Sequence, residues 1–150
     1  MPDFQPMVLM RCAPSGLRRG PLEAFARRLR NRLTGGGRFQ CLITDDRELQ
    51  NLNRQFLNKN YPTDVLSFPS ENAGTAAELG EIAISFERAR EQARALGHSI
   101  TDEIRILMLH GVLHLMGMDH ERDRGAMARA ETGWRHKLGL PAGLIERASA

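Results

Sequence analysis

The chain has 150 residues, of which 41% are hydrophobic, and contains two cysteines. This length suits one hydrophobic core of ordinary size, so we expect a single domain over residues 1–150. The longest apolar stretch, residues 106–118, is interrupted by two histidines and is too short to span a bilayer, which argues against a membrane protein. The chain begins with no signal-peptide pattern, and Cys12 and Cys41 lie outside any C-x-x-C motif. We therefore expect both cysteines to be buried in strands and the protein to be cytoplasmic.

Positive charge is concentrated in the first part of the chain. Residues 1–60 contain eleven Lys or Arg and five Asp or Glu, whereas residues 61–150 contain ten and thirteen. Most of the basic residues are arginines, whose planar guanidinium suits phosphate and stacks on bases. A polyanionic partner is therefore permitted. The simpler interpretation is that the arginines of residues 18–32 form the solvated face of a helix.

The hydrophobic pattern predicts strands and helices in alternation, followed by a helical end. Period-two apolar runs predict four strands, at residues 7–12, 39–44, 64–68 and 79–85. Three- and four-residue spacing with capping signals predicts five helices, at residues 21–33, 46–57, 86–96, 101–117 and 124–138. Residues 72–77 are small and polar and should form a loop. The order predicts an α+β fold, with a small mixed four-stranded sheet and helices packed around it.

Three of the five histidines lie within eleven residues, as His110, His114 and His120. Histidines four apart on a helix lie about 40° apart around its axis and one turn along it, so both can reach one cation. Gly117 permits a left-handed turn that would return His120 to the same face. Three protein nitrogens with a fourth position for water are typical of a catalytic zinc site. We therefore predict a metal site on this buried central helix, with zinc as the default and nickel, copper or iron as alternatives.

The competing interpretation is that these histidines are hydrogen-bonded core residues. The surrounding segment is apolar on nearly every side, which marks a helix that is buried all round. Burying two neighbouring imidazoles needs a shared reason, and a common metal ion supplies one. The second ring nitrogen of each ligand should then bond to a carboxylate or carbonyl. Asp119 is the nearest candidate in sequence, and Asp102, Glu103 and Glu81 are weaker ones.

The histidine pattern is similar to the metzincin metalloprotease signature, with one change. Those proteases carry a glutamate after the first histidine, where it acts as general base, and this chain has Gly111 there. Glycine cannot accept a proton. Peptide hydrolysis is therefore the least favoured function.

Residues 109–120 instead resemble the YbeY family of bacterial rRNA-maturation endoribonucleases. Residues 61–69, with Asn53 before them, resemble a second block of that family, and residues 79–85 resemble a third. The resemblance implies a single-domain protein of strands and helices with a zinc-type ion on the three histidines. It also implies cleavage of single-stranded RNA in ribosomal RNA maturation, including the 3′ end of 16S rRNA, and in ribosome quality control.

Two positions depart from the family pattern. Glu81 stands where the family usually has aspartate, and Leu57 stands where it has a functional arginine. Leucine can neither bind phosphate nor stabilise developing charge. Arg54 and Lys59 lie close by in the sequence, so we take them as candidates for the substrate-binding cation.

Two functions remain open at this point. One is a metal-dependent endoribonuclease whose partners are single-stranded or ribosomal RNA and the small ribosomal subunit or its assembly factors. The other is a metal-stabilised ribosome-assembly factor that binds RNA or ribosomal subunits without cleaving. Leu57 is the residue that keeps the second function open.

Overall fold

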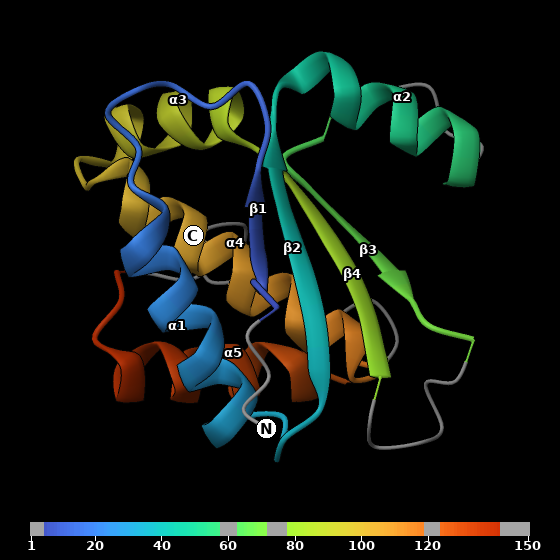
Figure 1. Cartoon of the computed structure of the whole chain (residues 1–150). Coiled ribbons are helices and arrows are strands. Elements are labelled where there is room, and N and C mark those ends of the chain that lie inside the picture. Colours follow the sequence, from blue (N-terminus) through green and yellow to red (C-terminus); the bar gives the residue numbers. More distant parts are fainter. Residues whose placement is uncertain (1–4, 58–62, 72–77, 119–123, 142–150) are drawn as a thin grey trace.

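The computed structural model describes residues 5–57, 63–71, 78–118 and 124–141. Strands and helices are interspersed along these residues, and the last three described elements are helices, as predicted (Figure 1). The elements are β1 (Val8–Met10), α1 (Arg19–Arg32), β2 (Arg38–Thr44), α2 (Asp46–Leu57), β3 (Val65–Pro69), β4 (Glu78–Ser85), α3 (Phe86–Leu96), α4 (Ile100–Leu115) and α5 (Ala126–Leu138). The α+β prediction is confirmed, whereas the loop predicted at residues 72–77 lies outside the described residues. No helix in the described part of the chain is long and apolar enough to cross a membrane.

The sheet is mixed, with the strand order β1-β2-β4-β3. Strands β1, β2 and β4 run parallel, and β3 pairs antiparallel with β4. Ile82 of β4 stands opposite Cys41 on one side and Ser67 on the other. Because side chains alternate between faces along a strand, these three residues share one face of the sheet, and Glu81 lies on the other.

Helix α4 is the centre of the molecule. It contacts α1, α3 and α5 as well as strands β3 and β4, and it crosses behind the sheet in Figure 1. Eleven of its sixteen residues are buried, which agrees with the apolar pattern on all sides of this segment. Helix α2 also contacts β3 and β4, and its residue Leu49 forms a small separate cluster with Leu66 and Ala83. These two residues belong to the sheet face opposite α4.

The ends of the helices follow the capping signals in the sequence. Ser85 accepts a hydrogen bond from the backbone N–H of Arg88, as predicted. Helix α4 begins one residue earlier than expected, because Ser99 caps it by accepting from the N–H of Asp102 at 3.0 Å. At the other end Gly117 adopts a left-handed conformation with φ of +92°, which confirms the predicted turn.

The two cysteines differ, which corrects one expectation. Cys41 is buried in β2, and burial raises the pKa of its thiol to about 12. Cys12 was expected in a strand, but it is exposed and lies beyond the end of β1. Its φ of 58° is incompatible with an extended strand, so the chain turns away from the sheet there.

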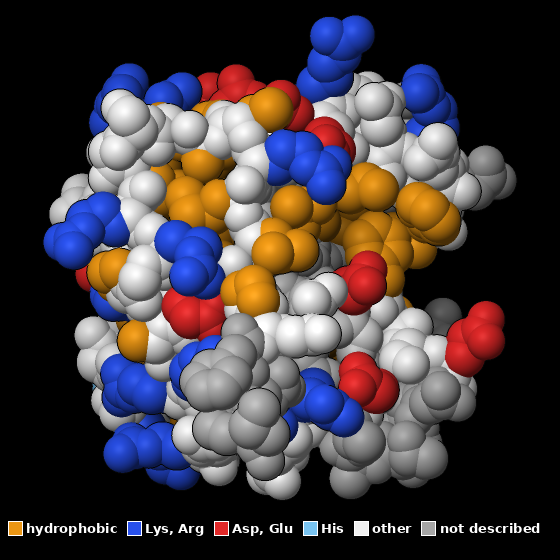
Figure 2. All heavy atoms as spheres, viewed as in Figure 1, with side chains coloured by type: hydrophobic (Ala, Val, Ile, Leu, Met, Phe, Trp, Pro, Cys, Tyr) orange, Lys and Arg blue, Asp and Glu red, His pale blue; other side chains and the backbone are white. Residues whose placement is uncertain are grey.

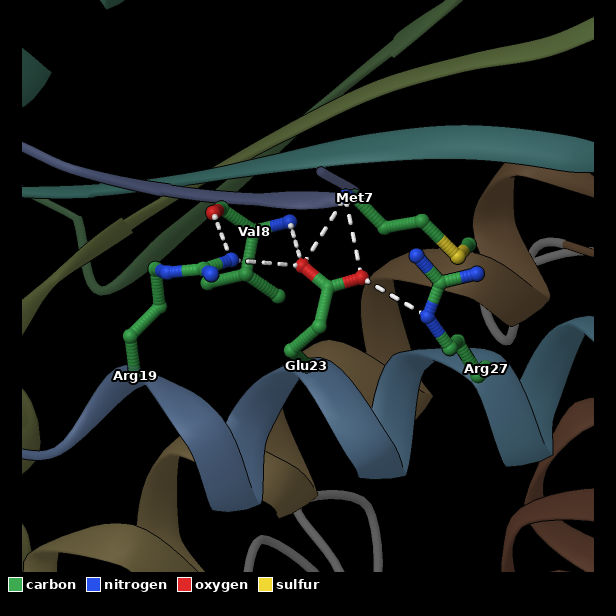
Figure 3. A network of polar contacts seen from close by, with 5 residues as sticks. All are labelled: Met7, Val8, Arg19, Glu23 and Arg27. Atoms are coloured by element: carbon green, nitrogen blue, oxygen red, sulfur yellow. Dashed lines mark hydrogen bonds and ion pairs between the residues drawn. The ribbon is translucent and has the colours of Figure 1, made fainter. Parts of the chain in front are cut away.

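A glutamate on α1 satisfies backbone groups of the edge strand β1. Figure 3 shows the carboxylate of Glu23 pointing at β1, where it accepts hydrogen bonds from the N–H groups of Met7 and Val8 at 3.0 to 3.1 Å. Arg19 and Arg27 flank the same carboxylate at 2.9 and 3.3 Å. These two arginines therefore take part in the contact between α1 and β1.

We expect Glu23→Ala to lower the free energy of unfolding by about 1–3 kcal/mol, because it leaves two backbone donors of β1 without their acceptor. Glu23→Gln should cost less, since its amide oxygen still accepts. Equilibrium urea unfolding measures both. Arg27→Ala is the matched control, because its exposed ion pair should contribute less than about 1 kcal/mol. Equal effects of Glu23→Ala and Arg27→Ala would contradict the assignment of the backbone bonds.

Candidate metal centre

His110 and His114 lie on one face of α4 with their rings turned toward each other. Their Nε2 atoms are 3.2 Å apart, and the ring planes meet at 72°. Two imidazole ligands of a tetrahedral zinc ion, each about 2.0–2.1 Å from the metal, have nitrogens roughly 3.3 Å apart. The predicted pairing of the two rings is therefore present, with a spacing that fits a shared ion. The same distance also allows an N–H···N hydrogen bond between the rings.

The third predicted ligand, His120, lies outside the described residues. Within the residues that the structure does describe, no group of three His, Cys, Asp or Glu side chains gathers as a metal site. The described part of the centre is the imidazole pair on α4 and the left-handed turn at Gly117 that follows it. The role of His120 as a ligand stays a prediction.

A carboxylate that the sequence analysis missed lies against His110. Glu131 of α5 is fully buried, and its Oε2 atom is 2.7 Å from Nδ1 of His110. Its position on α5 contained a signal, because Met127 and Trp134 lie four residues before it and three after it. These spacings place Glu131 on the apolar face of the helix, where an acidic residue needs a partner.

Of the carboxylates proposed from the sequence, Glu103 and Asp102 pair with other residues. Glu103 is buried on α4 two turns before His110, and its Oε1 atom is 2.6 Å from Nε2 of His98. Asp102 pairs with Arg105, and Glu81 is on the opposite face of the sheet. Asp119 lies outside the described residues.

The two histidines open onto a cleft of about 450 Å³ between α2, β3 and α4. The described residues that line it are Asn53, Leu57, Thr63, Asp64, Val65, Leu66, Ser67, Pro69, His110 and His114. Leu57 is 39% exposed and contributes to this wall, so the position where the family resemblance implies an arginine does face the histidines.

Neither candidate for a replacement cation is placed in the cleft by the described residues. Arg54 is exposed, is not among the lining residues, and its guanidinium donates to Oδ1 of Asn51 at 2.9 Å. Lys59 lies outside the described residues. The substrate-binding role of both residues stays a prediction.

Helix α4 approaches the sheet closely at Gly111. A Cβ on this residue would lie 3.0 Å from Cγ2 of Ile82, and the hydroxyl of Ser67 donates to the Gly111 carbonyl at 3.1 Å. The glutamate of the metzincin pattern would therefore require the side chain of Ile82 to shift. The packing of α4 on β4 disfavours it, in addition to any requirement of the chemistry.

We expect Gly111→Ala to lower the free energy of unfolding by about 1–3 kcal/mol through overpacking against Ile82. In an Ile82→Ala background the same change should cost little or stabilise, because alanine favours a helix over glycine by about 1 kcal/mol. Gly133→Ala on α5 is the matched control, since a Cβ there meets nothing within 4 Å. Chemical unfolding of the wild type, the two single variants and the double variant gives the double-mutant cycle. An equal cost of Gly111→Ala with and without Ile82 would contradict the contact.

A second cavity of about 350 Å³ lies on the other face of the sheet, beside α2. Figure 2 shows hydrophobic side chains gathered on this face. Leu9 and Phe56, which are 42% and 66% exposed, contribute to its lining together with Arg11 and Glu81. No histidine lines it, so among the described residues the metal-ligand chemistry lies on the α4 side.

Comparisons with known proteins bear on the family and the fold of the chain. Residues 22–139, which include both histidines of the pair, match the family model described as Endoribonuclease YbeY. A protein of that name from Solibacter usitatus (strain Ellin6076) is 60% identical over 140 residues, which cover 93% of this chain and 92% of the relative. Another from Koribacter versatilis (strain Ellin345) is 48% identical over 94% of this chain and 91% of the relative. The solution structure of TM1509 from Thermotoga maritima has a TM-score of 0.58 at 25% identity, covering 85% of this chain and 86% of that one.

Proposed function

Because the chain belongs to the YbeY endoribonuclease family, we propose that it is a metal-dependent endoribonuclease that cleaves single-stranded RNA during ribosomal RNA maturation. The proposal includes the 3′ end of 16S rRNA and ribosome quality control as its tasks, the cytoplasm as its location, and the small ribosomal subunit or its assembly factors as partners. Zinc on His110, His114 and His120 is the proposed cofactor. The observation that carries the proposal is the pair of Nε2 atoms, 3.2 Å apart, at a cleft of about 450 Å³.

The lining of the cleft supports the need for a bound cation. No Lys or Arg is among its described lining residues, and Asp64 adds a negative charge. A phosphodiester entering this part of the cleft therefore finds no side-chain cation there to offset its charge. A divalent ion would supply that charge, polarise a phosphoryl oxygen and acidify water.

The described residues of the cleft differ in what they can contact. The imidazoles would hold the ion, and the apolar wall of Leu57, Val65 and Pro69 suits the sugar or base of an RNA strand better than its phosphate. Thr63 and Asn53 provide polar groups at the same cleft. The hydroxyl of Ser67 donates to the Gly111 carbonyl, so it contributes to the packing of α4 on the sheet.

One observation favours the second candidate, a metal-stabilised ribosome-assembly factor that binds RNA or ribosomal subunits without cleaving. Leu57 lines the cleft at the position of the family's implied arginine, and its side chain carries no charge to stabilise a transition state. The two candidates differ only in whether RNA is cut.

Cleavage of single-stranded RNA by purified, zinc-loaded protein separates the two candidates. We expect the wild type to cut, chelation to stop it, and His114→Ala to remove detectable cleavage while the circular dichroism spectrum is retained. His136→Ala is the matched control, because His136 is exposed on α5 and should cut like the wild type. Metal-loaded wild type that binds RNA or subunits and cuts nothing would favour the assembly factor, more so if Leu57→Arg then cuts.

The same assay tests the two candidate cations. If Arg54 supplies the charge that Leu57 lacks, Arg54→Ala should slow cleavage about tenfold, and the same holds for Lys59 and Lys59→Ala. A tenfold change corresponds to about 1.4 kcal/mol of transition-state stabilisation. Unchanged rates for both variants would remove these residues from substrate binding.

A further inference from the structure

We propose that Glu131 is a positioning residue that fixes the ring orientation and tautomer of His110, so that its Nε2 atom faces the cleft. This inference rests on the proposed metal centre and adds a fourth residue to it, on a different helix. Glu131 is 21 residues away from His110 in the sequence. The carboxylate contacts the histidine, and Glu131 is not among the residues that line the cleft.

The contact between the two residues determines which ring nitrogen carries the proton. Oε2 of Glu131 is 2.7 Å from Nδ1 of His110, and an ionised carboxylate can only accept at that distance. Nδ1 of His110 must therefore carry the hydrogen and donate it. In the neutral ring this leaves the lone pair on Nε2, the atom that lies 3.2 Å from Nε2 of His114. A metal ligand needs that lone pair.

Burial makes this contact more than a surface ion pair. The side chain of Glu131 is 0% exposed and that of His110 is 8% exposed. A carboxylate so far from water is costly unless it is paired and hydrogen-bonded. Glu131 occupies a position of α5 that contacts His110, and the other buried residues of α5 are Met127 and Leu138. Glu131 is therefore placed to hold the His110 ring from its Nδ1 side, which leaves Nε2 to act as the metal ligand.

A second His–Glu pair, between His98 just before α4 and Glu103 in its first turns, provides an internal comparison. Glu103 is also 0% exposed and is 2.6 Å from His98, but there the carboxylate faces Nε2 of the ring. His98 is not among the residues that line the cleft. Both pairs therefore join an imidazole to a fully buried carboxylate, and they differ in whether the histidine lines the cleft.

The test compares Glu131→Ala and Glu131→Gln with the matched control Glu103→Gln. Zn²⁺ affinity is measured by competition with a chromophoric chelator. We expect Glu131→Ala to weaken Zn²⁺ binding about 10- to 100-fold, the range found when the outer partner of a ligating histidine is removed. Glu131→Gln, which keeps the shape and one acceptor, should weaken it by about tenfold at most and decides the question if the alanine variant does not fold. Glu103→Gln should bind Zn²⁺ like the wild type even if it is less stable.

The second readout uses metal-free protein and so is independent of loading and of activity. ¹⁵N-histidine NMR, at a pH where the rings are neutral, reports the tautomer of each imidazole. We expect His110 to carry its hydrogen on Nδ1 in the wild type and in Glu103→Gln, and to lose this preference in Glu131→Ala. Zinc affinity and a His110 tautomer that both match the wild type in Glu131→Ala would overturn the proposal.

His114→Ala separates failure of this inference from failure of the proposed metal centre. If the wild type binds Zn²⁺ no more tightly than His114→Ala, the centre itself is wrong and the role of Glu131 falls with it. If His114→Ala loses Zn²⁺ but Glu131→Ala does not, the centre stands and only the positioning role is removed.

Discussion

Helix α4 lies so close to strand β4 at Gly111 that a Cβ on this residue would stand 3.0 Å from Ile82. The bond from Ser67 to the Gly111 carbonyl joins the same point of the helix to β3. Together these contacts set the height and rotation of α4 over the sheet. His110 precedes Gly111 directly, and His114 follows one turn later on the same face. The packing of the helix at Gly111 therefore also determines where the two histidines lie relative to the sheet.

A helix buried on all sides leaves its polar groups no water, so each must find a partner within the protein. Glu103 is paired with His98 near the start of α4, and Glu131 reaches His110 from α5 near its end. Of these two pairs, only the second has a histidine on the cleft, whose described lining includes Leu57 and Asp64 and no basic side chain. This combination makes the proposed chemistry depend on a bound ion, because the described part of the cleft offers phosphate no basic side chain.

Much of this arrangement could be predicted from local spacing in the sequence. Apolar periodicity predicted the helices and strands, the four-residue step between His110 and His114 predicted their shared face, and Gly117 predicted the turn after α4. The contact of Glu131 with His110 could not be predicted, since it depends on how α5 packs against α4. Gly111 was interpreted from chemistry alone, as the loss of a general base, because its steric role requires Ile82 from another element. The prediction that Cys12 lies in a strand was wrong for a local reason, because its φ is positive and strand propensity does not detect this.

The most direct test of the proposed metal centre is zinc-edge X-ray absorption on the zinc-loaded protein. A centre built from His110, His114 and His120 predicts one zinc per chain with three imidazole nitrogens at about 2.0–2.1 Å and one further light-atom ligand. Replacement of His114 by alanine should remove one imidazole from that shell. Zinc that shows no imidazole scattering, or a spectrum that His114→Ala leaves unchanged, would contradict it.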